Sequence, residues 1–451
     1  MLRPSVPAAA PVVRDGGRLV VQTWLFSRLL LVGVALWVGV TTGRSAGDML
    51  ANWDVQHYFA IATNGYTGDN DIAFFPGWPL VLRAFSMVGV PMLWAGVGLA
   101  LICSALAAAA LHRLGGPIAA VVWLLAPTTV FTLVPYTEAP FCAAAFWAWE
   151  RAKRGHWGAA ASLAAIACTL RVSGLFLLGA LVILALTDGR RRGRAGGAAN
   201  PAVGRPGPSI GWPGALSGWA SPPSGRPGAA SGRSSDPSGR SRWSGPLARW
   251  FRPAVPPAVA YHPAAPVIGW RDRVRALTWL LIPALTLFAY MAFLHDLTGD
   301  WNAWYRAQST GWPRGFTWPW VSLQHTLEAA SSNAYPAYPE WSWVFRGEII
   351  AMALGLLVTI ACLVRRQWGE ASWVGVQVLA FSCSYWFLSV NRAVLLWFPL
   401  FVLIGEVLSG GWNVTPRRRR LRILLTVLGF VVAGILLCFW AWLFFTGRWA
   451  S

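Results

Sequence analysis

Long apolar runs separated by short polar or basic segments dominate the pattern of this chain. The first run covers residues 24–42 and the next clear one about 91–111. Three longer apolar blocks follow at 117–150, 157–187 and 371–409. A helix that crosses the hydrocarbon core of a bilayer needs roughly 20 apolar residues. The pattern therefore predicts an all-α, polytopic transmembrane protein.

Each of the three long blocks is broken in the middle by polar residues. The breaks read "PYTEAP", "RVSG" and "SVNRA", and both flanks of every block are basic. A single span would export one basic flank, against the preference of Lys and Arg for the cytoplasmic side. Each block therefore predicts two spans joined by a turn on the outer side.

The remaining apolar segments complete a topology of about eleven spans. Arg14 and Arg18 precede the first run, which places the N-terminus in the cytoplasm and the C-terminus outside. Residues 74–90 contain two prolines and Arg83, and we interpret them as a short helix in the outer interface or as a re-entrant hairpin. The last three predicted spans are residues 276–294, 349–364 and 421–446.

The charge pattern agrees with a membrane protein. Only 12% of the residues are charged, and the net charge of +20 comes almost entirely from arginine, with Lys153 the single lysine. The arginines form short clusters beside apolar runs, as the positive-inside rule requires, so we expect no nucleic-acid partner. The six cysteines all lie in apolar runs and are interpreted as small packing residues.

Composition divides the chain into three parts. Residues 1–188 form an N-terminal transmembrane part whose first outer loop is 43–73. Residues 189–272 are rich in Gly, Pro, Ser and Arg and predict a disordered, basic cytoplasmic linker. It tethers the two halves, and attraction to anionic lipid headgroups is a second interpretation. Residues 273–451 form a C-terminal transmembrane part with a long outer loop at 295–346.

The predicted topology brings the polar breaks to one face of the membrane. Glu138, Arg171 and Arg392 each have apolar sequence on both sides, and ionisable groups near membrane depth usually mark a site or pathway. Asp54 follows the first span in the cluster "WDVQHYF". The candidate substrate-binding residues on this face are Trp53, His57, Tyr58, Tyr136, Glu138, Arg171, Asn391 and Arg392.

These residue types suit a substrate that combines a sugar, a phosphate and a lipid tail. The guanidinium fork matches phosphate oxygens. A carboxylate can take the proton from an attacking hydroxyl. A transferase outside the cytoplasmic membrane has no nucleotide sugars and must use a lipid-linked donor. The sequence has no competing phosphate loop, hydrolase triad or metal-ligand spacing.

The motifs and their order resemble the PIG-V-like mannosyltransferases, which are membrane glycosyltransferases of the GT-C type. The similarity rests on "NWDVQHYFAIATNGY", "FFPGWPLVLR", "PYTEAPFCAAAFWAWERAKRG", "LRVSGLFL" and "NRAVLLWFPLF". It implies a polyprenyl-phosphate-mannose donor, inverting transfer on the outer face and an acidic general base in the first outer loop. Asp54 matches that base, and Asp71 is a second acidic candidate. Arg171 and Arg392 are the candidates for the donor phosphate.

The resemblance leaves several points open. The acceptor is a glycolipid, a lipoglycan or a protein. No cofactor is expected, although Asp54 with Asp69 or Asp71 could hold a divalent metal ion. A transporter or flippase of a lipid-linked saccharide is the main alternative, and it predicts internal repeats and helices broken at the bilayer midplane. A scaffold protein would explain the basic linker but not the outer acidic and arginine cluster.

Overall fold

The computed structural model describes residues 12–196, 269–312, 314–410 and 416–450, which form helices and no strand. The N-terminal helices are α1 (Val12–Thr42), α2 (Ala46–Leu50), α3 (Asp54–Asn64), α4 (Gly77–Met87), α5 (Met92–Leu124), α6 (Glu138–Lys153), α7 (Trp157–Leu170) and α8 (Ser173–Gly196). The C-terminal helices are α9 (Trp270–Trp279), α10 (Leu281–Thr298), α11 (Ala303–Gly311), α12 (Pro319–Ala329), α13 (Glu340–Val364), α14 (Trp368–Ser382), α15 (Val390–Ala393), α16 (Phe398–Ser409) and α17 (Pro416–Phe445). Short 3₁₀ turns lie at η1 (Asp69–Ala73), η2 (Thr129–Thr132) and η4 (Val394–Leu396).

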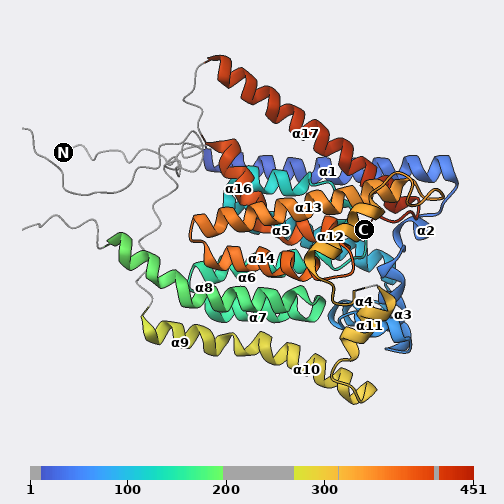
Figure 1. Ribbon diagram of the computed structural model, residues 1–451, viewed down its shortest axis with the longest axis horizontal. Coiled ribbons are helices and arrows are strands. Elements are labelled where there is room, and N and C mark those ends of the chain that lie inside the picture. The colour runs from blue at the N-terminus through green and yellow to red at the C-terminus, as the bar shows by residue number, and fades with distance from the viewer. Residues whose placement is uncertain (1–11, 197–268, 313, 411–415, 451) are drawn as a thin grey trace, which may run out of the picture. The chain divides into compact units, whose positions relative to one another are not determined.

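The long helices lie side by side, and both halves of the chain contribute to one bundle (Figure 1). Helix α5 packs against α1 and α6 from its own half and against α16 from the other half. The short helices α3, α4 and α11 gather at one end of the bundle, where α11 packs on η1. Contacts within the chain divide it into two units, and the bundle belongs to the first. The second unit is Gly193–Tyr261, of which only the end of α8 lies within the described residues.

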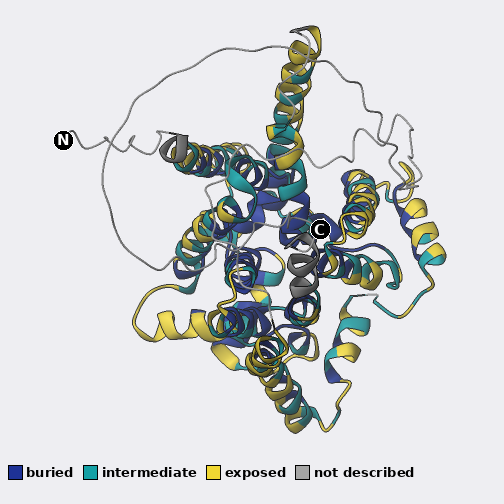
Figure 2. Cartoon of the chain, turned by 90° about the vertical axis from the view of Figure 1, so that its left-hand side faces the viewer, coloured by how far each residue is buried: buried dark blue, intermediate teal, exposed yellow. Residues whose placement is uncertain are grey.

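Several helices expose apolar side chains, as a lipid-facing surface requires. Figure 2 shows buried residues along the inner faces of the helices and exposed ones at the periphery. Large apolar side chains such as Leu29 in α1, Phe288 in α10 and Ile435 in α17 are more than half exposed. Five described helices are long and apolar enough to cross a membrane, or six if the bent pair Val390–Leu396 and Phe398–Ser409 is one span. The chain is therefore a multi-pass helical membrane protein, and the predicted number of eleven spans stays a prediction.

The three predicted breaks are present in the structure. The chain leaves helical conformation between α5 and α6 at "PYTEAP" and between α7 and α8 at "RVSG". At "SVNRA" the chain forms α15 and η4, and the axis bends by 70° before α16. Proline interrupts helices, and so do polar side chains that hydrogen-bond to the nearby backbone. Because both effects are local, the breaks could be placed from the sequence.

Other boundaries differ from the prediction. The expected third span, which begins at 117, is a helix only to Leu124. After it, buried threonines of η2 bond to backbone carbonyls and compete with the helix. The predicted outer loop 295–346 contains α11 and α12, and α13 begins at Glu340, nine residues before the predicted span. Most of the predicted linker lies outside the described residues, but its two ends are helical, because α8 continues to Gly196 and α9 begins at Trp270.

Helix α6 carries a charged cluster at each of its ends. It begins at Glu138, whereas its C-terminal end carries Glu150, whose carboxylate pairs with Arg113, Arg151 and Arg154 at 2.5–2.7 Å. A helix of 16 residues is about 24 Å long. The arginine cluster around Glu150 and the breaks that carry the candidate site therefore lie at opposite ends of this helix.

Gly174 in the "RVSG" break is the first testable packing position. A Cβ at Gly174 would lie 2.6 Å from the Cα of Cys168 in α7, so Gly174→Ala is expected to destabilise the protein by about 1–3 kcal/mol. Gly179 lies in the same helix, and a Cβ added there would meet no atom within 4 Å. Gly179→Ala is the matched control and is expected to be neutral or slightly stabilising. Thermal unfolding of the detergent-purified variants measures the difference, and equal melting temperatures would show that Gly174 tolerates a side chain.

Candidate functional site

An ion pair between Asp54 and Arg392 joins the N-terminal and C-terminal parts of the chain at the site. Asp54 occupies the first turn of α3, and Arg392 lies in α15, at the bend before α16. Nη1 of Arg392 donates to Oδ2 of Asp54 at 2.6 Å, and both side chains are at most 15% exposed. The structure therefore brings together the first and last polar motifs that the sequence singled out.

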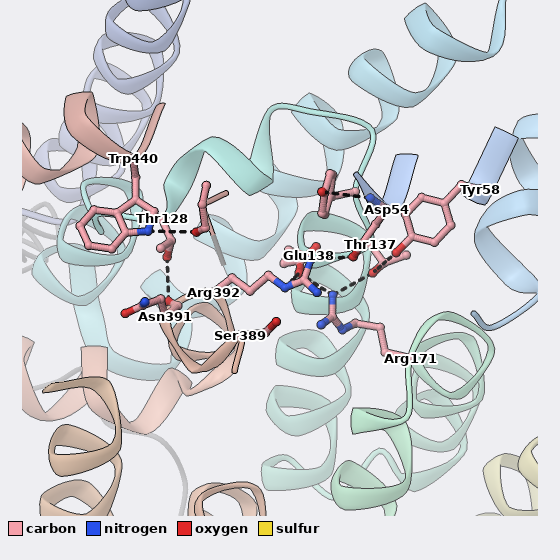
Figure 3. A network of polar contacts seen from close by, with 12 residues as sticks. Asp54, Tyr58, Thr128, Thr137, Glu138, Arg171, Ser389, Asn391, Arg392 and Trp440 are labelled. Atoms are coloured by element: carbon pink, nitrogen blue, oxygen red, sulfur yellow. Dashed lines mark hydrogen bonds and ion pairs between the residues drawn. The ribbon is translucent and has the colours of Figure 1, made fainter. Parts of the chain in front are cut away.

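Glu138 holds two arginines behind this pair. Its carboxylate is fully buried, and Oε1 lies 2.5 Å from Nη1 of Arg171 and 3.7 Å from Nε of Arg392. Arg171 also donates to the hydroxyl of Thr137 at 2.9 Å. Figure 3 shows both guanidinium groups directed toward Glu138 from opposite sides. Because a buried charge requires a partner, Glu138 fixes the position of both cations.

Backbone strain flanks the site on both sides. Trp53, directly before Asp54, has φ +57°, and Ser389, three residues before Arg392, has φ +66°. Non-glycine residues with positive φ are uncommon and cost about 1–3 kcal/mol each. Such strain concentrates at functional sites, where the fold imposes a required geometry.

A cavity of about 480 Å³ lies at this site. Asp54, Tyr58, Arg171 and Arg392 are the predicted site residues among its lining side chains. Much of the wall is apolar or aromatic, including Phe74, Trp304, Trp312 and Phe381. A cavity of this size with few, convergent polar groups is typical of small-molecule sites, and its apolar wall can receive a lipid tail.

Arg314 is a cavity residue that sequence analysis placed only in the outer loop. It precedes α12, and its nearest described hydrogen-bond partner is the Ser389 hydroxyl at 3.5 Å. Among the described residues no carboxylate oxygen lies within 4.0 Å of it, unlike Arg171 and Arg392. Burial, together with the nearby charge of Arg392, lowers the pKa of Arg314 to about 10. The sequence places Arg314 in the long loop 295–346, but its flanks are not continuously apolar, so it was not singled out as a site residue.

His57 and Asp71 form a second pair beside the cavity. Nδ1 of His57 lies 2.9 Å from Oδ1 of Asp71, and Oδ2 of Asp71 accepts the backbone N–H of Gly68. The His57 ring stacks on Phe74, a cavity residue, at 4.7 Å between centroids. Neither His57 nor Asp71 lines the cavity itself, and their contacts join α3 to the segment that contains η1. A direct catalytic role for Asp71 stays a prediction.

Three other predicted residues also lie behind or outside the cavity wall. The Tyr136 hydroxyl accepts the backbone N–H of Asp54 at 3.3 Å, and its ring centroid lies 5.6 Å from the guanidinium carbon of Arg392. Asn391 is buried and donates from Nδ2 to the carbonyl of Val344 at 3.0 Å. The Trp53 side chain is 43% exposed. Tyr136 and Asn391 therefore position their neighbours, and substrate contact by any of the three stays a prediction.

The three aspartates that were considered as metal ligands have different surroundings. Asp54 pairs with Arg392, Asp71 pairs with His57, and Asp69 is exposed. Across the residues that the structure describes, no group of three or more His, Cys, Asp or Glu side chains is arranged to hold a metal ion. A divalent ion held by Asp54 with Asp69 or Asp71 stays a prediction.

Comparison with known proteins supports the resemblance seen in the motifs. Residues 22–188 match the family described as Mannosyltransferase (PIG-V). The chain is 35% identical over 152 residues to GPI alpha-1,6-mannosyltransferase 2 of Mus musculus and 33% identical over 156 residues to that of Homo sapiens. Each alignment covers 30% of this chain and 31% of the relative, so the chain matches less than a third of the relatives' length. No solved structure matches the chain.

The matched region confirms the resemblance to the PIG-V-like mannosyltransferases over the N-terminal part. It contains Asp54, Glu138 and Arg171 but ends before Arg314 and Arg392. The family match therefore does not extend to the C-terminal residues of the site.

Proposed function

We propose that this chain is a membrane glycosyltransferase that transfers mannose from polyprenyl-phosphate-mannose to an acceptor hydroxyl on the extracytoplasmic face. The observation that carries the proposal is the cavity in which Asp54 lies beside three arginines and an apolar wall. The family match and the mannosyltransferase activity named for the relatives support the sugar. The donor, the face and the acceptor class rest on the chemistry of the site and on the resemblance.

Asp54 acts as the general base in this proposal. It takes the proton of the acceptor hydroxyl, whose oxygen attacks the anomeric carbon of the donor from the side opposite the phosphate. The bond from that carbon to the phosphate oxygen breaks, and the configuration inverts. Arg171 and Arg392 stabilise the negative charge that develops on the departing phosphate. Glu138 and Tyr136 keep the two arginines and the start of α3 in position.

The charges near the two ends of α6 support the extracytoplasmic location that we propose for the site. The arginine cluster around Glu150 lies at one end of the helix and the candidate site at the other. The positive-inside rule assigns the arginine cluster to the cytoplasm and hence the site to the outer side. A glycolipid, a lipoglycan or a protein can supply the acceptor hydroxyl.

Transfer in isolated membranes tests this function. Membranes that contain the wild-type chain are given radiolabelled polyprenyl-phosphate-mannose, and labelled lipid and protein products are counted. We expect a labelled product that is absent from membranes lacking the chain. Labelled GDP-mannose, with endogenous synthesis of the lipid-linked donor blocked, should give none. A transporter or flippase would move the donor across vesicles without forming any product, and that outcome would overturn the proposal.

A further inference from the structure

The arginines of the site differ in how they are engaged. Arg171 is paired with Glu138, and Arg392 is paired with Asp54. Arg314 lines the same cavity but has no such carboxylate partner among the described residues. Glu348 is near enough to affect Arg314 electrostatically, yet its two oxygens accept the backbone N–H groups of Ser389 and Asn391 at 3.1 and 2.9 Å.

The Asp54–Arg392 pair presents a chemical conflict with the proposed base. A carboxylate whose Oδ2 accepts a charge-assisted hydrogen bond at 2.6 Å has that lone pair engaged. The same contact keeps Nη1 of Arg392 from an incoming phosphate. An exchange of partners would free both groups for the roles that the reaction needs.

We propose that the phosphate of the donor binds Arg314 and displaces Asp54 from Arg392, so that donor binding releases the general base. This inference rests on the proposed function and deepens it. Arg314 is the cation available to the incoming anion, and Arg392 exchanges one oxyanion partner, the carboxylate, for another, the phosphate. Asp54 is then free to accept the proton of the acceptor hydroxyl.

The exchange also balances the charges of the reaction. The phosphodiester donor carries one negative charge, and the leaving polyprenyl phosphate carries two once the bond to the anomeric carbon has broken. Arg314 and Arg392 face that additional charge while Asp54 becomes neutral on protonation. The lowered pKa of Arg314 agrees with this assignment, because burial and then repulsion by Arg392 disfavour its charged form, and a bound anion would stabilise that form. The mechanism is therefore ordered, with donor binding preceding activation of the acceptor.

A binding measurement separates this exchange from a site in which Asp54 and the arginines act independently. The probe is citronellyl phosphate, a short isoprenyl phosphate, titrated into the detergent-purified chain by calorimetry with citronellol as the uncharged control. Asp54→Asn removes the competing carboxylate charge and is expected to bind the phosphate about tenfold more tightly than wild type. Arg314→Gln is expected to bind it at least about tenfold more weakly, and Arg314→Lys less so.

Arg306→Gln provides the matched control for the arginine variant. Arg306 belongs to the same outer segment, pairs with Asp300 at 2.7 Å and is 64% exposed, so its replacement should leave the dissociation constant unchanged. Melting temperatures close to wild type show that each variant is folded. If Asp54→Asn binds no more tightly, or if Arg314→Gln binds as wild type does, the exchange is wrong while the proposed function stands. If the folded wild type binds citronellyl phosphate no more tightly than citronellol, the exchange and the proposed donor are both overturned.

Discussion

Asp54→Asn is expected to reduce mannosyl transfer by about 10²–10⁴-fold, the range that a positioned general base contributes. Asparagine keeps the size of the side chain and an oxygen for Arg392 but cannot accept the proton of the acceptor hydroxyl. The contact between Arg392 and Oδ2 of Asp54 makes this the most direct test of the site. The measurement is incorporation of label from polyprenyl-phosphate-mannose in membranes with matched expression of each variant.

The control for this variant comes from the same segment, residues 43–73. Asp69 is an exposed carboxylate of η1, so Asp69→Asn should transfer mannose at the wild-type rate. Asp71→Asn keeps an acceptor oxygen for His57 but loses the carboxylate charge, and it should show a smaller decrease than Asp54→Asn. Wild-type transfer by Asp54→Asn would show that Asp54 is not the base, and Asp71 and Glu138 would then be the carboxylates to test.

Glu138→Ala is expected to cost about 3–5 kcal/mol of stability, because it leaves the guanidinium of Arg171 without its counter-charge and removes a second carboxylate from beside Arg392. Glu138 is fully buried, and its Oε1 contacts Arg171 and faces Arg392. Glu138→Gln keeps the volume and an acceptor oxygen, so it should lose less. Thermal or denaturant unfolding of the purified variants in one detergent measures the ranking.

Glu328→Ala is the comparison for this stability prediction. Glu328 is an exposed carboxylate of α12 whose contact is to Gln324 of the same helix, so its replacement should stay within about 0.5 kcal/mol of wild type. Equal stability of Glu138→Ala and wild type would mean that Glu138 does not hold the two arginines. The position of the arginines would then require another explanation.

The residues of the site come from four distant parts of the chain. Asp54 comes from α3, Glu138 from α6, Arg171 from the break after α7 and Arg392 from the bend before α16. Each lies at the end of a helix, where the chain can leave the apolar interior. Rigid helices on either side hold the charged groups, as precise positioning of a reaction requires.

The helical membrane fold, the three breaks and the four central charged residues could be predicted from the sequence. These features are local: apolar runs require helices in a bilayer, and an ionisable residue within such a run is conspicuous. Motif order also led to the mannosyltransferase resemblance that the family match confirms for residues 22–188.

Which of these residues form ion pairs with one another is visible only in the tertiary structure. The contact between Asp54 and Arg392 joins positions 338 residues apart, and no local pattern specifies it. It also separated Asp71 and Asn391, which bind neighbouring protein groups, from the residues that line the cavity, and it added Arg314 from a loop. Packing between distant helices sets such pairings, because a charge in an apolar flank must find a partner wherever the fold provides one.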